Sequence, residues 1–110
     1  MFKVENNPNF NISRYHYERL YNKLKRGEIK YIAMQYPTRN INELKDIFEG
    51  NKDIIFVSNE ENFKEALETN KYENYFIDKF AGDFGHFTPK SNRLIAENVA
   101  NVILDELGIN

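Results

Sequence analysis

The sequence predicts an α/β protein, because short apolar strands alternate with amphipathic helices along its 110 residues. Two segments, residues 29–35 and 53–58, are short, apolar and rich in β-branched and aromatic side chains. Segments before, between and after them carry apolar residues at helical spacing. Alternation of this kind is typical of strands that pair in parallel. We therefore expect two parallel strands flanked by helices.

The first half of the chain begins with residues 1–12, which are Asn-rich and without periodicity and are expected to form a flexible lead-in. The folded region then occupies residues 13–110. Ser13 is positioned to cap a helix that runs to about Arg26 and ends at Gly27. The apolar face of this helix comprises Tyr17, Leu20, Tyr21 and Leu24. The strand at 29–35 follows and is stopped by Pro37.

The middle of the chain predicts a helix, a strand and a second helix. Either Asn40 or Asn42 can cap the first helix, which continues to about Glu49 and is closed by Gly50. The strand at 53–58 comes next. A helix from about Asn59 to Glu68 then begins directly after that strand.

The last third predicts an irregular segment and a long helix. Residues 72–87 are aromatic and are interrupted by Gly82 and Gly85. Thr88 then caps the helix, and Pro89 occupies its first position, where a missing N–H costs no hydrogen bond. Its apolar face comprises Leu94, Ile95, Val99, Val102, Ile103 and Leu107, and Gly108 ends it.

Composition limits the classes of function. Hydrophobic residues make up 41% and charged residues 29%, which indicates a soluble globular chain. The absence of cysteine excludes disulfides, thiolate metal sites and a cysteine nucleophile. A net charge of −2 argues against a nucleic-acid partner, and no apolar run approaches the ~20 residues that span a bilayer. The N-terminal residues lack the pattern of a signal peptide, so we expect a cytoplasmic protein.

Two strands are too few for a parallel sheet, which normally has both faces covered. The free edge would be apolar and open to pairing with another strand. We therefore expect either further strands upstream or another chain that supplies them. This edge could serve self-association or a complementing chain.

The candidate chemistry lies in the segment from Asp83 to His86, just before the last helix. A carboxylate at this spacing can accept a hydrogen bond from one ring nitrogen of the histidine, and the other nitrogen can then take a proton from a hydroxyl. Gly85 allows a tight turn between them. A metal site formed by Asp78, Asp83 and His86 is an alternative, but it lacks further ligands, so we expect no metal and no cofactor.

The segment GDFGHFTPKSNRLIAENVANVIL resembles the C-terminal signature of the SGNH (GDSL-type) hydrolases, in which Asp-x-x-His precedes the final helix. The resemblance implies a flavodoxin-like α/β/α fold and hydrolysis of an ester or acylated small molecule. It assigns the triad acid to Asp83 and the general base to His86. In this family the serine lies in a Gly-Asp-Ser motif, and later Gly and Asn blocks complete the oxyanion hole.

The chain departs from this family by lacking the Gly-Asp-Ser and Gly-x-Asn-Asp blocks. Gly50-Asn51-Lys52-Asp53 precedes a strand, whereas the family asparagine follows one. Residues 13–110 are therefore expected to be the C-terminal half of an incomplete SGNH-like domain, which is inactive alone. The three serines, Ser13, Ser58 and Ser91, are expected to be helix-start or turn residues.

Two further interpretations remain open. The loop after the first strand could line a substrate pocket through Tyr36 and Arg39, or it could be an ordinary turn. The whole chain could instead be a non-catalytic α/β module that uses its open sheet edge for oligomerisation or interaction. His16, on the first helix, is expected to be a surface histidine.

Overall fold

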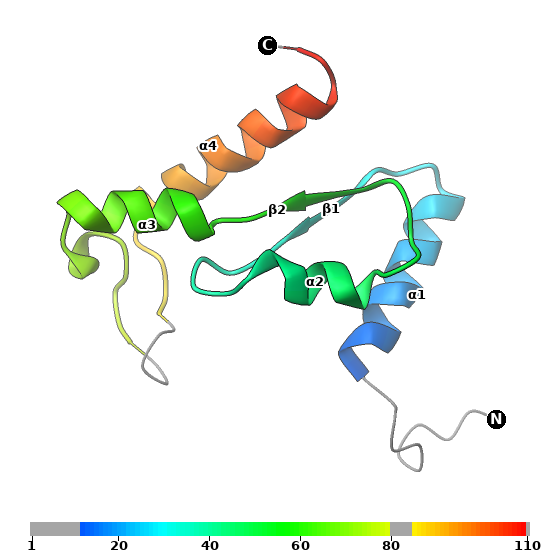
Figure 1. The fold of residues 1–110 in the computed structure, drawn as a ribbon, viewed down its shortest axis with the longest axis horizontal. Helices are drawn as coiled ribbons and strands as arrows, with labels where there is room; N and C mark the ends of the chain where they lie inside the picture. Colours follow the sequence, from blue (N-terminus) through cyan, green and yellow to red (C-terminus); the bar gives the residue numbers. More distant parts are fainter. Residues whose placement is uncertain (1–11, 80–84, 110) are drawn as a thin grey trace.

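A computed structural model of the chain describes residues 12–79 and 85–109. Within these ranges, four α-helices and one short 3₁₀-helix surround a two-stranded parallel sheet (Figure 1). The elements are α1 (Ile12–Arg26), β1 (Tyr31–Met34), α2 (Ile41–Ile47), β2 (Ile54–Val57), α3 (Glu60–Thr69), η2 (Tyr72–Asn74) and α4 (Pro89–Glu106). The predicted α/β class and the predicted parallel pair are confirmed.

The two strands pair in register from Tyr31 opposite Ile54 to Met34 opposite Val57. Both strands are shorter than the sequence predicted, because the ladder stops where the chain turns away. Gln35 extends the pairing by one bond, as its backbone N–H donates to the Val57 carbonyl at 3.0 Å. Pro37 is buried directly beyond this point.

Helices α1 and α2 cover one face of the sheet. Their core consists of Tyr21 from α1, Tyr31 and Ala33 from β1, and Leu44 and Phe48 from α2 and its end. Aromatic edge-to-face contacts link the layers: the rings of Tyr31 and Phe48 lie 5.3 Å apart. The Tyr21 hydroxyl also donates to the Lys52 carbonyl at 2.8 Å. This bond gives the hydroxyl of a buried tyrosine a partner, and it links α1 to the residues just before β2.

A second core lies between α3, η2 and the start of α4. It is built on buried Phe63, Tyr75 and Phe76, with Phe87 packed against them. The high aromatic content of the sequence is concentrated here and in the first core, and large rings fill volume that so short a chain could not fill with small side chains. This second core supports the segment that carries the candidate histidine.

The starts of two helices, α2 and α4, agree with the sequence prediction. Asn40, and not Asn42, caps α2, because its side chain accepts from the Asn42 N–H at 2.7 Å. Thr88 caps α4 by accepting from the Ser91 N–H at 3.3 Å, and Pro89 takes the first position, as predicted. Gly50 and Gly108 have φ of 85° and 70°, which fits their predicted places after helices.

The start of α1 differs from the prediction, whereas the start of α3 agrees with it to within one residue. Helix α1 already includes Ile12, so Ser13 lies in its first turn and the predicted lead-in ends earlier; residues 1–11 lie outside the described ranges. Helix α3 begins at Glu60, and Asn59 precedes it without a side-chain cap bond. The reason is tertiary: the Asn59 side chain is fully buried and bonds to other elements.

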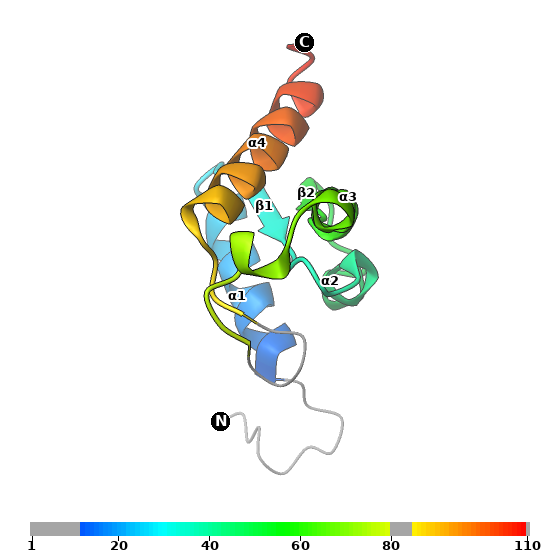
Figure 2. The ribbon, with the colours of Figure 1, turned by 90° about the vertical axis from the view of Figure 1, so that its left-hand side faces the viewer.

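The sheet face opposite α1 and α2 is only partly covered. Figures 1 and 2 show α4 crossing this side, and α4 contacts β2. Ile55 and Val57 of β2 are therefore buried, whereas Ile32 and Met34 of β1 remain 37% and 46% exposed. Leu107, predicted on the inner face of α4, is also exposed. An apolar surface consequently lies beside β1.

The described residues contain no helix that is both long and apolar enough to cross a membrane.

Candidate functional site

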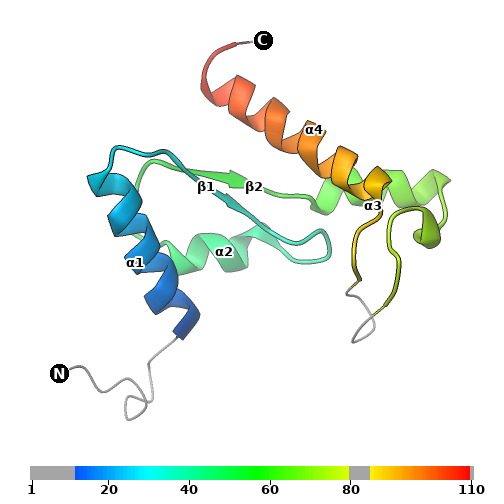
Figure 3. The ribbon, with the colours of Figure 1, turned by 180° about the vertical axis from the view of Figure 1, so that it is seen from behind.

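His86 lies on a short segment that pairs with the residues after η2 and leads into α4. Phe76 and Phe87 form an isolated antiparallel bridge. The Ile77 N–H donates to the His86 carbonyl at 2.8 Å, and the Thr88 N–H donates to the Tyr75 carbonyl at 3.1 Å. Figure 3 shows the two arms of this segment side by side near α3. The backbone of His86 is thus fixed on both sides.

Among the described residues, Asp78 brings its carboxylate into contact with His86. Its Oδ2 lies 2.7 Å from His86 Nδ1, and its Oδ1 accepts from the His86 backbone N–H, also at 2.7 Å. The His86 side chain is 64% exposed. Asp83, predicted as the acid partner, lies outside the described residues, so its role stays a prediction. From the sequence, Asp78 was expected only as one ligand of the alternative metal site.

The Asp78 carboxylate is stabilised in its charged form. The hydrogen bond from the His86 backbone N–H is the largest cause that lowers the pKa of Asp78, and the bond from the imidazole lowers it further. Partial desolvation acts in the opposite direction. At neutral pH Asp78 is therefore an anion beside the histidine ring.

Gly85 is required at its position by close packing. A methyl group there would collide with the Asp78 carbonyl oxygen and lie 2.7 Å from the Tyr72 hydroxyl oxygen. The Tyr36 hydroxyl donates to the Gly85 carbonyl and accepts from the Gly85 N–H, each at 2.7 Å. The Tyr36 ring stacks on Phe87, with centroids 5.5 Å apart. Tyr36 therefore joins the end of β1 to the histidine segment.

Tyr36 and Arg39 are not brought together as a pocket. Tyr36 points to the Gly85 segment, and Arg39 is exposed in the turn after β1, where its N–H donates to the Tyr36 carbonyl at 2.9 Å. A small cavity of about 170 Å³ does lie at the carboxyl ends of the strands. Its lining is Met34, Gln35, Tyr36, Pro37, Asn59, Phe87 and Ile95. Substrate binding by Tyr36 and Arg39 remains a prediction.

Asn59 organises the strand ends and was missed by the sequence reasoning. Its amide donates to the Gln35 carbonyl at 3.2 Å, and its side-chain oxygen accepts from the Asn98 amide at 2.9 Å. Asn98 also donates to the Ser58 carbonyl at 2.7 Å. The sequence signal was weak, because an asparagine after a strand is equally typical of a helix cap. This network fixes α4 against the carboxyl ends of both strands.

The serines of the chain serve local structure, as the sequence predicted for Ser58 and Ser91. The Ser58 hydroxyl accepts from the Glu60 N–H at 3.3 Å at the start of α3. Ser91 is fully buried, and its hydroxyl donates to the Tyr75 carbonyl. Ser13 is exposed in the first turn of α1. A buried Ser91 has no access to substrate.

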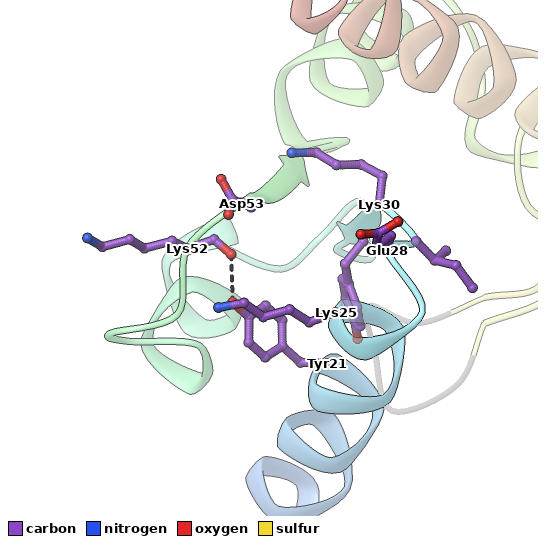
Figure 4. A pocket seen from close by; sticks show the side chains of 8 residues that line it. Tyr21, Lys25, Glu28, Lys30, Lys52 and Asp53 are labelled. Carbon is purple, nitrogen blue, oxygen red and sulfur yellow. Dashed lines mark hydrogen bonds between the residues drawn. The ribbon is translucent and has the colours of Figure 1, made fainter.

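The larger cavity, of about 330 Å³, lies at the opposite ends of the strands (Figure 4). The residues that line it include Tyr21, Lys25, Glu28, Lys30, Lys52 and Asp53. Glu28 and Asp53 have φ of 57° and 65°, which marks the tight turns that precede the two strands. Three lysines and two acids line this cavity, so charges of both signs surround it.

Among the described residues, no group of three or more His, Asp or Glu side chains could hold a metal ion. Comparison of the chain with protein-family models, with curated proteins and with solved structures gave no match.

Proposed function

We propose that this chain supplies the histidine and its carboxylate partner for a serine ester hydrolase of the SGNH type. One observation carries the proposal: a carboxylate oxygen 2.7 Å from Nδ1 of an exposed histidine, on the segment that leads into the final helix. This is the relationship that a triad acid has to its histidine. The Asp-x-x-His pattern and the Thr88–Pro89 helix start supply the likeness to that family.

The proposed chemistry follows from the ring nitrogens of His86. With Nδ1 donating to a carboxylate, Nε2 takes the proton of a serine hydroxyl as the serine oxygen attacks the ester carbonyl. The protonated ring then gives that proton to the leaving alcohol, and water repeats the sequence on the acyl-enzyme. The substrate class is an ester or acylated small molecule, such as an acylated sugar or an acyl lipid.

None of the serines of this chain is the proposed nucleophile. Ser91 is buried, and Ser58 accepts a backbone hydrogen bond at the start of α3. No glycine flanks Ser58 to form the sharp turn of a nucleophile. We therefore propose that a Gly-Asp-Ser segment outside this sequence completes the site, and that the apolar surface beside β1 receives it.

The proposal is tested with a fluorophosphonate probe and p-nitrophenyl acetate. The chain alone should remain unlabelled and should turn over no ester beyond the rate of its His86→Ala variant. Co-expression with the polypeptide encoded immediately upstream should give labelling of a serine in that polypeptide. Turnover should then be lost in His86→Ala and kept in the control His16→Ala.

Two outcomes would overturn this proposal. One is stoichiometric labelling of Ser58 in the isolated chain, with turnover that depends on His86, since the nucleophile would then be internal. The other is an upstream region that encodes no Gly-Asp-Ser segment.

A second candidate function is a non-catalytic module that associates through its open sheet. The exposed apolar side chains of Ile32 and Met34 on β1 favour this function. A Met34→Lys variant should then reduce the mass measured by light scattering to that of a monomer. An Ile29→Lys variant, at an exposed position just before the strand, should leave the mass unchanged. A strictly monomeric unmodified chain would exclude this function.

A further inference from the structure

The contact between Asp78 and His86 is made by both carboxylate oxygens. Oδ1 accepts from the backbone N–H and Oδ2 faces Nδ1 of the same residue, each at 2.7 Å. Two bonds to one residue fix the direction of the carboxylate as well as its distance. The ring orientation of His86 is thereby coupled to its own backbone.

The backbone around Asp78 is held by contacts that do not involve its carboxylate. The Tyr72 hydroxyl donates to the Asp78 carbonyl at 2.7 Å. The preceding residue, Ile77, bonds to the His86 carbonyl, and the Phe76–Phe87 bridge aligns the two arms. This antiparallel pairing brings Asp78 into direct contact with His86, which lies eight residues later in the sequence.

An ionised carboxylate can only accept hydrogen bonds. The nitrogen that faces it must therefore carry the proton, which assigns Nδ1–H to the neutral ring of His86. In that tautomer the lone pair lies on Nε2, at the far side of the ring. This is the form that a general base requires.

We infer that Asp78, eight residues before His86, is a positioning residue that selects the Nδ1–H tautomer of His86 and orients its ring. The inference departs from the Asp-x-x-His pattern, which assigns this task to Asp83. The catalytic role of this tautomer rests on the proposed function, but the assignment of the tautomer does not. An experiment can therefore refute one of them without refuting the other.

The test is nitrogen NMR of the full chain labelled with ¹⁵N-histidine. The chain has only two histidines, and His16 on the exposed side of α1 provides an internal reference. In the unmodified chain at pH 8, His86 should show a protonated Nδ1 and an unprotonated Nε2. A nuclear Overhauser contact should join the Nδ1 proton to the β protons of Asp78.

Substitution then separates the two aspartates. In Asp78→Ala, His86 should revert to the Nε2–H tautomer that free imidazole side chains favour in water, and exchange of its backbone N–H should accelerate about tenfold or more as a charge-assisted bond is lost. In the control Asp83→Ala, the Nδ1–H signal should persist. The resonances of His16 and of the aromatic core report whether each variant is folded.

Three results would overturn the inference: an Nε2–H tautomer of His86 in the unmodified chain, loss of the Nδ1–H signal in Asp83→Ala, or its retention in Asp78→Ala. The contact between Nδ1–H and the Asp78 β protons needs no substitution, so its absence also refutes the inference if Asp78→Ala fails to fold. Lack of esterase activity in a reconstituted enzyme would count against the proposed function and leave the tautomer assignment intact.

Discussion

Replacing Gly85 with alanine should destabilise the protein more than any other single methyl addition at its described glycines. The added methyl would collide with the Asp78 carbonyl and approach the Tyr72 hydroxyl oxygen to 2.7 Å, and the Phe76 Cβ to 3.2 Å. Two of these neighbours belong to the backbone or to a buried aromatic core residue, so neither can withdraw without moving the segment.

The magnitude follows from two costs. Overpacking of a close-packed site costs about 1–3 kcal/mol. Displacing Gly85 also weakens its two hydrogen bonds with the Tyr36 hydroxyl, each contributing about 1 kcal/mol. We expect Gly85→Ala to lower the free energy of unfolding by about 3 kcal/mol, which for a chain of this size lowers Tm by about 15 °C.

Thermal and urea unfolding followed by circular dichroism and tyrosine fluorescence provide the assay. Gly27→Ala is the matched control, because a methyl there meets its nearest neighbour, the Ile29 side chain, at an ordinary distance of 3.5 Å. The control should change stability by less than about 1 kcal/mol. A Gly85→Ala variant as stable as Gly27→Ala would refute the packing described around the histidine segment.

The remaining predictions concern the contacts that hold the strand ends and the histidine segment. Asn59→Ala should lower the free energy of unfolding by about 2–3 kcal/mol in urea titration, because it removes a fully buried amide and leaves the half-buried Gln35 carbonyl and Asn98 amide with fewer partners. Tyr36→Phe should cost about 1–2 kcal/mol, because it keeps the ring stack on Phe87 and removes both bonds to Gly85. Stability should also depend on acid through Asp78: its folded pKa lies below the unfolded value, so its contribution is present above about pH 4 and is lost as the pH falls through the folded pKa. The stability difference between the unmodified chain and Asp78→Asn should therefore shrink as the pH falls below about 4.

Each of these predictions has a control in the chain. Asn62→Ala removes one half-buried amide that donates to the Asn59 side-chain oxygen at 3.3 Å, and it should cost less than Asn59→Ala. Tyr15→Phe, on α1, removes an exposed hydroxyl that accepts from Arg19 at 3.3 Å, and it should cost less than Tyr36→Phe. An Asp53→Asn variant, in the turn before β2 and away from His86, is the control for Asp78→Asn. Equal effects in target and control would contradict the contacts assigned to Asn59, Tyr36 or Asp78.

The sequence predicted the features that depend on neighbours along the chain. Thr88 and Pro89 start α4 because a capping oxygen and a fixed φ act within one turn. Two short apolar runs became a parallel pair. The low strand count predicted an open apolar edge, and the structure shows in addition that Ile32 and Met34 are exposed on one face of the sheet. The flavodoxin-like layering and the ester-hydrolase activity remain proposals based on resemblance.

Tertiary structure decided the contacts between residues far apart in sequence. The Asn59 side chain makes no cap bond to α3, because it bonds instead to half-buried Gln35 and Asn98. Tyr36 reached Gly85 across 49 residues, and the Phe76–Phe87 bridge brought Asp78 to His86. The pattern of neighbouring residues cannot predict these contacts, because each contact forms only when segments far apart in the sequence are brought together by the fold. His86 could therefore be singled out as a candidate from the sequence, whereas its contact with Asp78 depends on the fold.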